Sequence, residues 1–137
     1  MSNVLPSFHL LHLAGQCADN LFATQGSPLS PRQYVVLAML EGGKGASQTD
    51  IVRATGIDRS TLAEVVKRLV AVGYIQRRRS EADTRAYVVR LTGTGRKVLD
   101  ASRGAATLTD ERLFAPVPAS HRAQFLENLA RVAVKVR

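Results

Sequence analysis

Apolar residues recur at helical spacing near both ends of the chain, in about residues 4–25 and about residues 119–136. One face of each predicted helix carries an apolar row, because residues three and four positions apart lie together on a helix surface. The rows consist of Leu10, Leu13 or Ala14, Cys17 and Leu21 in the first helix, and of Phe125, Leu129, Val132 and Val136 in the last. Both faces are wide for helices at the edge of a small domain.

A second helix is predicted to start at Ser30, which can cap it, with Pro31 at the first helical position, where a missing N–H costs nothing. Residues 34–40 (YVVLAML) are apolar all round, so this helix should be buried on every side. The helix should end at the glycine pair Gly42-Gly43.

Two further helices joined by a tight turn follow. Ser47 and Asp50 form a capping box for a short helix, residues 55–57 (TGI) supply a glycine-containing turn, and Asp58 caps the helix of residues 58–72. Its apolar residues, Leu62, Val65, Val66, Leu69 and Val70, are spaced to form one buried face. This order of helices and turn predicts a helix-turn-helix.

Beyond Gly73, which should end that helix, the pattern changes to that of strands. Residues 74–80 and 86–91 are rich in β-formers and arginine, and the polar, charged residues 81–85 separate them. The segment of residues 74–91 therefore predicts a β-hairpin directly after the helix-turn-helix, which is the position of a wing.

Another helix is predicted from its cap at Thr92 toward Phe114, with Gly104 as a weak point inside it. Pro116 and Pro118 interrupt the chain before the last helix.

These elements predict a mainly helical α+β fold, with a winged helix-turn-helix core over residues 30–95 inside a single domain of residues 1–137. The core is complete without residues 1–25 and 96–137, yet both of these segments carry apolar faces. A domain this small cannot easily cover both, so we expect them to form a helical dimerisation region with a second copy of the chain. Packing of the end helices on each other in a monomer is the alternative.

The distribution of charge indicates a polyanion partner. The formal net charge is +8, and residues 53–97 hold eleven Lys and Arg against four Asp and Glu, a net +7 that leaves +1 for the rest of the chain. A basic stretch in an otherwise near-neutral chain is typical of a nucleic-acid site, although a solvated basic face is the simpler alternative.

The sequence indicates no other site chemistry. The single cysteine, Cys17, excludes an intramolecular disulfide and a CxxC zinc site, and His9, His12 and His121 lack a metal-ligand pattern. No nucleophile elbow, Walker loop or HExxH pair indicates an enzyme, and no cofactor or metal is expected. Because the chain shows no signal peptide and no run of 18 apolar residues, we expect a cytoplasmic protein without a membrane partner.

The helix-turn-helix and the residues at its junctions resemble the MarR (multiple antibiotic resistance regulator) family. The matching runs are residues 29–40 (LSPRQYVVLAML) and residues 47–95. Particular matches are Gln33, the DRSTL opening of the 58–72 helix, GYI before the hairpin, RRSxxDxR at its tip and LTxxG after it. A helix-turn-helix alone is shared by many families, whereas the wing motif followed by LTxxG makes the resemblance specific.

The resemblance implies an obligate homodimer that binds a pseudo-palindromic operator in double-stranded DNA and regulates transcription. Most members repress, and a small-molecule effector or cysteine oxidation releases them from DNA. It also implies an effector pocket between the first, second and fifth helices, with His12, Arg32 and Tyr34 as candidate polar lining residues. The residues themselves do not identify the effector or distinguish repression from activation.

The outer face of the 58–72 helix carries candidate DNA contacts, and its N-terminal turn can enter a major groove. These residues are Arg59, Ser60, Thr61, Glu64, Lys67 and Arg68. Arg59 can make a bidentate contact to guanine. The short hydroxyl donors suit phosphates or base edges, and the two basic residues further along suit phosphates.

Arg85, near the hairpin tip, is the strongest single candidate, because an arginine placed there can reach an adjacent minor groove, as the resemblance also implies. Asp83 would repel DNA unless it were paired, so we assign it an orienting role toward Arg85 or toward Arg77 and Arg79. Strand alternation places Arg77 and Arg79 on one face of the hairpin and Arg78 on the other.

Two alternatives stay open. Cys17 lies on the first helix, which suggests thiol-based redox sensing, although it sits in an apolar row with no basic neighbour to favour the thiolate. A winged helix can also serve protein–protein contact or RNA binding. Its basic, small-polar outer face favours DNA over a protein partner, and RNA recognition would more often bring stacking aromatics, of which the hairpin offers only Tyr74 and Tyr87.

Overall fold

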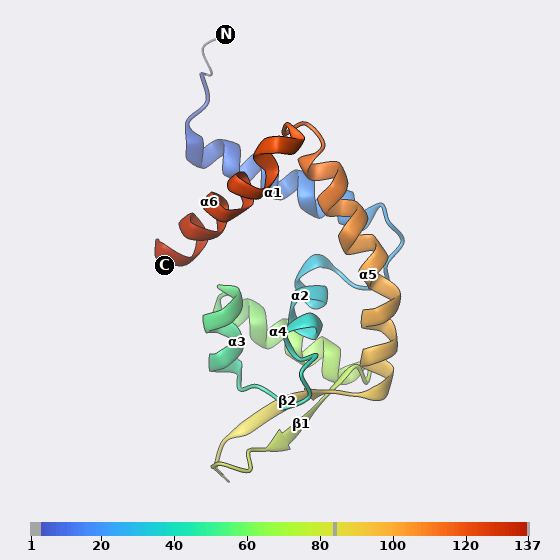
Figure 1. Cartoon of the computed structure of the whole chain (residues 1–137). Helices are drawn as coiled ribbons and strands as arrows, with labels where there is room; N and C mark the ends of the chain where they lie inside the picture. Colours follow the sequence, from blue (N-terminus) through green and yellow to red (C-terminus); the bar gives the residue numbers. More distant parts are fainter. Residues whose placement is uncertain (1–3, 84, 137) are drawn as a thin grey trace. The chain divides into compact units, whose positions relative to one another are not determined.

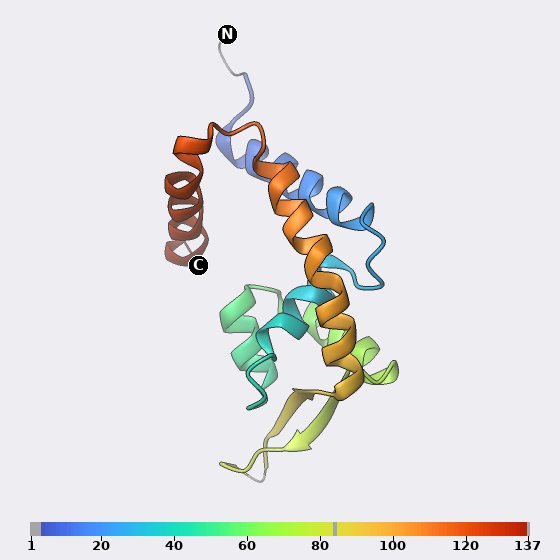
Figure 2. The same cartoon turned by 45° about the vertical axis from the view of Figure 1, so that its right-hand side comes forward.

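The computed structural model describes residues 4–83 and 85–136. The chain forms two compact units: a helix-turn-helix unit, Ser27–Arg103, and a terminal unit that combines Met1–Gly26 with Gly104–Arg137 (Figures 1 and 2). The elements are α1 (Ser7–Ala23), α2 (Pro31–Met39), α3 (Gln48–Thr55), α4 (Arg59–Ala71), β1 (Ile75–Arg79), β2 (Tyr87–Leu91), α5 (Gly93–Phe114), the 3-10 turn η1 (Ala119–His121) and α6 (Arg122–Lys135). The predicted mainly helical fold with one small antiparallel sheet is confirmed.

Capping boxes start α2 and α3 at the predicted residues. The Ser30 hydroxyl accepts from the N–H of Gln33 at 3.2 Å, and the Gln33 side chain accepts from the N–H of Ser30 at 2.9 Å. Ser47 and Asp50 exchange the same pair of bonds at 3.0 and 3.1 Å. Each bond satisfies an N–H that the first turn of a helix would otherwise leave unpaired.

Helix α4 ends in a Schellman motif, which confirms the stop predicted at Gly73. The N–H of Gly73 donates to the carbonyl of Val70 and that of Tyr74 to the carbonyl of Leu69, both at 3.0 Å. Gly73 has φ +80°, a left-handed conformation that costs glycine no Cβ clash. The chain therefore turns directly from α4 into β1.

The predicted hairpin is present, with β1 and β2 paired from Ile75 opposite Leu91 to Arg79 opposite Tyr87. Both views show it projecting beyond α2, α3 and α4 (Figures 1 and 2). Ala46 adds an isolated bridge to Val89 on the other edge of β2, through bonds of 3.0 and 2.9 Å. The sequence does not predict this bridge, because one paired residue leaves no alternating pattern.

The core of the helix-turn-helix unit is assembled from α2, α3, α4, the base of the hairpin and the start of α5. Its buried side chains include Leu29, Val36, Leu37, Leu40, Ala46, Ile51, Leu62, Val66, Leu69, Ile75, Val89 and Leu99. The face predicted for α4 is the buried one, since Leu62, Val66 and Leu69 are fully buried. Burial of these side chains holds the opposite face of α4 outward.

The prediction that residues 34–40 are buried on every side is wrong. Val35 is 44% exposed, because the contacts of α2 with α3 and α4 cover only part of its surface. The helix also ends at Met39, earlier than the predicted Gly42-Gly43, and Leu40 caps it. An apolar run predicts burial but not how many neighbours the helix has.

Helix α5 starts tightly against the base of the hairpin. The Thr92 hydroxyl accepts from the N–H of Gly95 at 3.0 Å, which confirms the predicted cap, and donates to the carbonyl of Gly73 at 2.6 Å. A Cβ on Gly95 would overlap the carbonyl oxygen of Tyr74 and lie 2.8 Å from its carbonyl carbon. The LTxxG pattern thus has a physical reason: the threonine caps the helix, and the glycine lets it approach the backbone closely.

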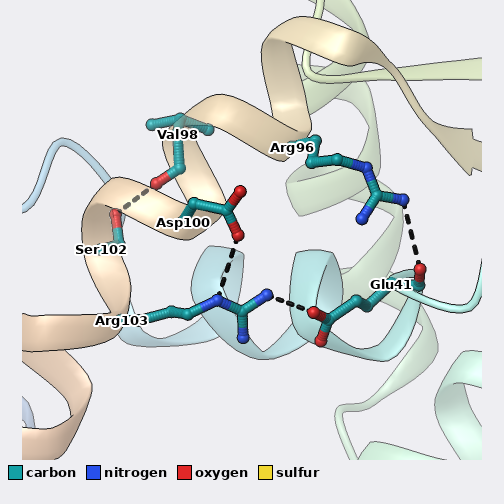
Figure 3. Close-up of polar contacts among 6 residues, drawn as sticks. All are labelled: Glu41, Arg96, Val98, Asp100, Ser102 and Arg103. Atoms are coloured by element: carbon teal, nitrogen blue, oxygen red, sulfur yellow. Dashed lines mark hydrogen bonds and ion pairs between the residues drawn. The ribbon is translucent and has the colours of Figure 1, made fainter.

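A polar cluster attaches the first half of α5 to the end of α2 (Figure 3). The Arg103 guanidinium pairs with the Glu41 carboxylate, and its Nε donates to Asp100 at 3.1 Å. Arg96 donates to the backbone carbonyl of Glu41 at 3.3 Å. The hydrogen bond with Glu41, followed by that with Asp100, raises the pKa of Arg103. Residues up to Arg103 therefore belong to the helix-turn-helix unit, although α5 continues through Gly104 as one helix.

The terminal unit contains α1, the second half of α5, η1 and α6. Phe114 meets Phe125 edge to face, with ring centroids 5.8 Å apart, and Arg122 donates to the carbonyl of Val117 at 2.8 Å. The predicted helix of residues 119–136 is a 3-10 turn followed by α6. Every described residue of α6 is at least partly exposed, so its apolar row has few partners within one chain.

Candidate nucleic-acid interface

The outer face of α4 is polar and basic. Of the residues predicted to contact DNA from this helix, Thr61 is half-buried, and the others, Arg59, Ser60, Glu64, Lys67 and Arg68, are exposed. The Arg59 guanidinium donates to the Thr49 hydroxyl of α3 at 3.2 Å. Because a guanidinium carries five N–H donors, this bond orients Arg59 and leaves further donors for a ligand.

The two hydroxyls at the start of α4 belong to its cap. Asp58 accepts from Ser60 Oγ at 2.8 Å, from Thr61 Oγ1 at 2.7 Å and from the N–H of Thr61 at 2.9 Å. These bonds, with the Thr61 hydroxyl as the largest cause, lower the pKa of Asp58 to about 2. The hydroxyl protons point at the protein, so a phosphate would have to displace Asp58 to receive them. Their role as DNA contacts stays a prediction.

The hairpin presents arginines on two opposite faces. Arg77 is paired with Val89 and Arg79 with Tyr87, so both arginines lie on one face, as predicted. On that face, the Arg79 guanidinium lies 5.1 Å from the centre of the Tyr87 ring, a cation–π contact. The other face carries Gln76, Arg78, Val88 and Arg90.

The hairpin face that carries Arg77 and Arg79 adjoins the start of α3. A polar recess of about 360 Å³ is lined by Ser47, Gln48, Thr49, Arg77 and Tyr87. We call the face with Arg77 and Arg79 the α3-side face and the one with Arg78 and Arg90 the far face. The sequence does not reveal that these α3 residues belong to the site, because only the folded chain brings them beside the hairpin.

Hydrogen bonds to the backbone shape the hairpin tip. Asp83 Oδ1 accepts from the N–H of Arg85 at 3.0 Å, and the Asp83 carbonyl accepts from the N–H of Ala86 at 3.0 Å. The Ser80 hydroxyl accepts from the N–H groups of Ala82 and Asp83 at 3.2 and 3.3 Å. Asp83 is thus bonded to the backbone of Arg85, and the Arg85 side chain is exposed at the tip. Asx-type bonds of this kind stabilise tight turns.

The candidate effector residues fall in different units. His12 is exposed on α1 of the terminal unit, and its ring lies 6.0 Å from that of His9. Arg32 is exposed and Tyr34 is half-buried on α2 of the helix-turn-helix unit. A pocket that unites them stays a prediction. Cys17, the candidate redox residue, is exposed on α1.

Within residues 4–83 and 85–136, no helix is both long and apolar enough to cross a membrane. In the same residues, no three His, Cys, Asp or Glu side chains gather to form a candidate metal site.

Comparison with known proteins identifies this arrangement. A family model described as MarR family matches residues 27–86. The chain is 30% identical over 126 residues to the HTH-type transcriptional repressor NicR of Pseudomonas putida. The aligned region covers 90% of this chain and 80% of that protein.

Solved structures of transcriptional regulators share the fold of nearly the whole chain. The PcaV transcriptional regulator of Streptomyces coelicolor, solved with its natural ligand, superposes with a TM-score of 0.88 at 30% identity and covers 100% of both chains. BpsR of Bordetella bronchiseptica, whose DNA binding is regulated by 6-hydroxynicotinic acid, gives a TM-score of 0.88 at 27% identity and covers 97% of this chain and 96% of that one. The helix-turn-helix, the basic hairpin and these similarities together show that the chain belongs to the MarR family of winged helix-turn-helix, DNA-binding transcriptional regulators.

Proposed function

We propose that this regulator is a homodimeric, effector-responsive repressor that binds a pseudo-palindromic operator with one α4 helix and one wing on each half-site. One observation carries the proposal: residues 53–97 hold +7 of the net charge of +8, and the arginines and lysines of α4 and the hairpin are exposed, apart from the half-buried Arg90. Binding rather than catalysis is its activity, and it acts in the cytoplasm. The name of NicR, a transcriptional repressor, supports repression over activation.

A second copy of the chain is the proposed partner of the terminal unit. Its exposed large apolar side chains include Phe8, Leu10, Leu11 and Leu13 on α1 and Phe125, Leu126, Val132 and Val134 on α6. An apolar recess of about 380 Å³, lined by α1, the end of α5 and α6, lies in the same unit. Apolar surface of this kind is stable in water only when a partner covers it. A twofold dimer would also present two α4 helices to half-sites about 34 Å apart.

We assign the effector to the small aromatic acids. BpsR, which is similar in sequence and fold, is regulated by 6-hydroxynicotinic acid, and PcaV was solved with its natural ligand. In this chain Arg32 would pair with the carboxylate, and Tyr34, on the same helix, would lie beside it. Adding 6-hydroxynicotinic acid to the protein–DNA complex should release DNA, and Arg32→Gln should raise the concentration required. If neither 6-hydroxynicotinic acid nor benzoic acid releases the DNA, small aromatic acids are not the effector class.

Arg85→Ala tests the DNA site. An arginine contact in a groove contributes about 1–3 kcal/mol, and a dimer carries two copies, so we expect operator affinity to fall at least about 25-fold and binding to be abolished at physiological salt. The DNA is a duplex that the wild-type protein selects from a random pool, and fluorescence anisotropy measures the dissociation constant. Arg112→Ala, which removes the same charge from an exposed position on α5, is the control.

The two variants should have the same circular dichroism spectrum and melting temperature as the wild type, because both side chains are exposed. If Arg85→Ala binds the selected duplex as tightly as Arg112→Ala does at physiological salt, the wing does not contact DNA as proposed.

A further inference from the structure

The far face of the hairpin forms a second basic surface. Register places Gln76 opposite Arg90 and Arg78 opposite Val88, with all four side chains on this face. With its amide turned so that both groups are satisfied, the Gln76 oxygen accepts from Arg78 Nε at 3.3 Å and Nη2 at 3.0 Å. A recess of about 560 Å³ borders the hairpin and is lined from both faces: by Gln76, Arg78 and Arg90 of the far face, by Arg77 and Arg79 of the α3-side face, and by Glu81.

Arg90 is held in place by its stem. A Cβ added to Gly45 would lie 2.9 Å from Arg90 Cγ and 3.3 Å from Nε, so the arginine lies flat over this glycine. Gly45 has φ +78°, which glycine adopts without strain. The Arg90 side chain is 34% exposed, and its buried Nε finds no hydrogen-bond partner among the described residues. An arginine fixed in this way loses little further freedom when its terminal nitrogens bind an anion.

The carboxylate facing Arg90 neutralises it only weakly. Glu81 Oε1 lies 3.8 Å from Arg90 Nη2, and the Glu81 side chain is 91% exposed. Ion pairs of this length and exposure contribute little, because water screens them. A phosphate, which accepts paired bonds from a guanidinium, would therefore displace Glu81.

We propose that the far face is a phosphate-binding surface, in which Arg78 and Arg90 contact the DNA strand on the far side of the minor groove that the wing enters. The proposal rests on the proposed function and adds a second strand to its contacts. No part of it concerns base recognition, since phosphate contacts set register and affinity rather than sequence.

Each face of the hairpin would contact one strand of the DNA. A hairpin inserted into a minor groove has a phosphodiester backbone on each side of it. The α3-side face adjoins the start of α3, so its arginines meet the strand next to the helix-turn-helix. Arg78 and Arg90 point the opposite way and meet the other strand, outside the stretch of DNA that α4 covers.

Arg78→Gln and Arg90→Met test the surface. Methionine keeps an unbranched stem over Gly45 but has no charge. The probe is the duplex selected by the wild-type protein, with one helical turn of added DNA beyond each wing. We expect each variant to bind about three- to tenfold more weakly, and the slope of log affinity against log salt to fall in magnitude by about 0.9 for each phosphate that the variant leaves without its arginine. Arg112→Gln, with the same loss of charge on α5, should match the wild type.

Ethylation of single phosphates locates the contacts. In the wild type, ethylation should interfere with binding on both strands beside the wing. In Arg78→Gln and Arg90→Met the interference on the far strand should vanish, while that on the strand next to the helix-turn-helix remains. Glu81→Gln should strengthen binding about two- to threefold by removing the competing carboxylate, whereas Asp110→Asn, an equal change of charge on α5, should not.

The outcomes separate the two proposals. A wild-type protein that selects no duplex at all overturns the proposed function. A wild type that binds DNA, with interference on one strand only, overturns the far-face surface, as do Arg78→Gln and Arg90→Met variants with wild-type affinity and salt slope. If Arg90→Met fails to fold, the ethylation pattern of the wild type and the affinity and salt slope of Arg78→Gln still test the far-face surface.

Discussion

At the scale of single residues, helix caps organise the DNA-binding unit, and Asp58 makes the largest set of cap bonds. Its carboxylate accepts from two hydroxyls and one backbone N–H at the start of α4. An ionised carboxylate accepts such bonds better than a protonated one, so these bonds stabilise the folded protein only while Asp58 is charged.

Asp58→Asn should therefore change how stability depends on pH. The pKa of Asp58 is lowered from 3.8 in the unfolded chain to about 2 in the folded protein. Its stabilising effect is thus fully present above about pH 4 and is lost as the pH falls from there through about 2. Asparagine is a good N-cap that does not titrate, so the variant should lose less melting temperature than the wild type between pH 5 and pH 2.

Thermal unfolding at pH 5, 4, 3 and 2 measures this effect. Asp110→Asn removes an exposed carboxylate near the C-terminal end of α5, away from any helix N-cap, and serves as the control. If the curves for Asp58→Asn and the wild type run parallel over the whole range, the cap bonds of Asp58 do not contribute as described.

The caps show which residue-level features the sequence predicts. Ser30, Ser47, Asp58 and Thr92 were all predicted as caps and act as caps, because each bond spans three residues along the chain. The use of the Ser60 and Thr61 hydroxyls was not predicted, although a signal was present: an N-cap aspartate with hydroxyls two and three residues later. Both hydroxyls suit DNA or the cap equally well by residue type.

At the scale of elements, the junction of the hairpin with α5 depends on close contact. The N–H of Thr92 donates to the Tyr74 carbonyl at 3.0 Å, and Gly95 packs against that same carbonyl. The base of the wing and the start of α5 are therefore joined by direct backbone contact.

Gly95→Ala should disrupt this junction. Because the new methyl group would overlap a backbone oxygen rather than a flexible side chain, we expect a loss of about 3 kcal/mol or more in the free energy of unfolding. Gly104→Ala, in the same helix, is the matched control: its Cβ meets no described atom within 4 Å, so the helix should gain about 0.5–1 kcal/mol. Urea unfolding of both variants measures the difference. Equal stability of the two would contradict the contact at Gly95.

The elements themselves were largely predictable, and their neighbours were not. Periodicity located α4 and its buried face correctly, because the row of Leu62, Val66 and Leu69 is a local pattern. Periodicity wrongly predicted that α2 is buried on every side, whereas Val35 is exposed, and it could not show the Ala46 bridge to β2. Burial on a particular side depends on which elements pack there.

At the scale of the whole molecule, the terminal unit carries more apolar surface than one chain covers. Val132, which lies in the apolar row predicted for the last helix, is 49% exposed on α6. Burying such surface between two chains would stabilise a dimer by about 25 cal/mol for each Å² removed from water, and a monomer forgoes this stabilisation.

Val132→Glu should therefore yield a monomer. A charge buried in an apolar interface is strongly unfavourable, and a monomer has one α4 helix for two half-sites, so operator affinity should fall as well. Light scattering after size exclusion measures the mass. Gln124→Glu adds the same charge at a polar position of α6 and should stay dimeric. A Val132→Glu protein that remains dimeric at micromolar concentration would place the interface elsewhere.

The sequence by itself determined the order of elements, the helix starts, the hairpin and the concentration of positive charge in residues 53–97, because each of these depends on residues close together in the chain. Only the tertiary structure decided which face of the hairpin adjoins α3, how Arg90 lies over Gly45, and how Glu41 meets Arg103. These contacts join residues on different elements, as far as 62 positions apart in the chain, and no periodic pattern encodes such distances. The family follows from the local features, and the two arginine faces of the wing follow from the fold.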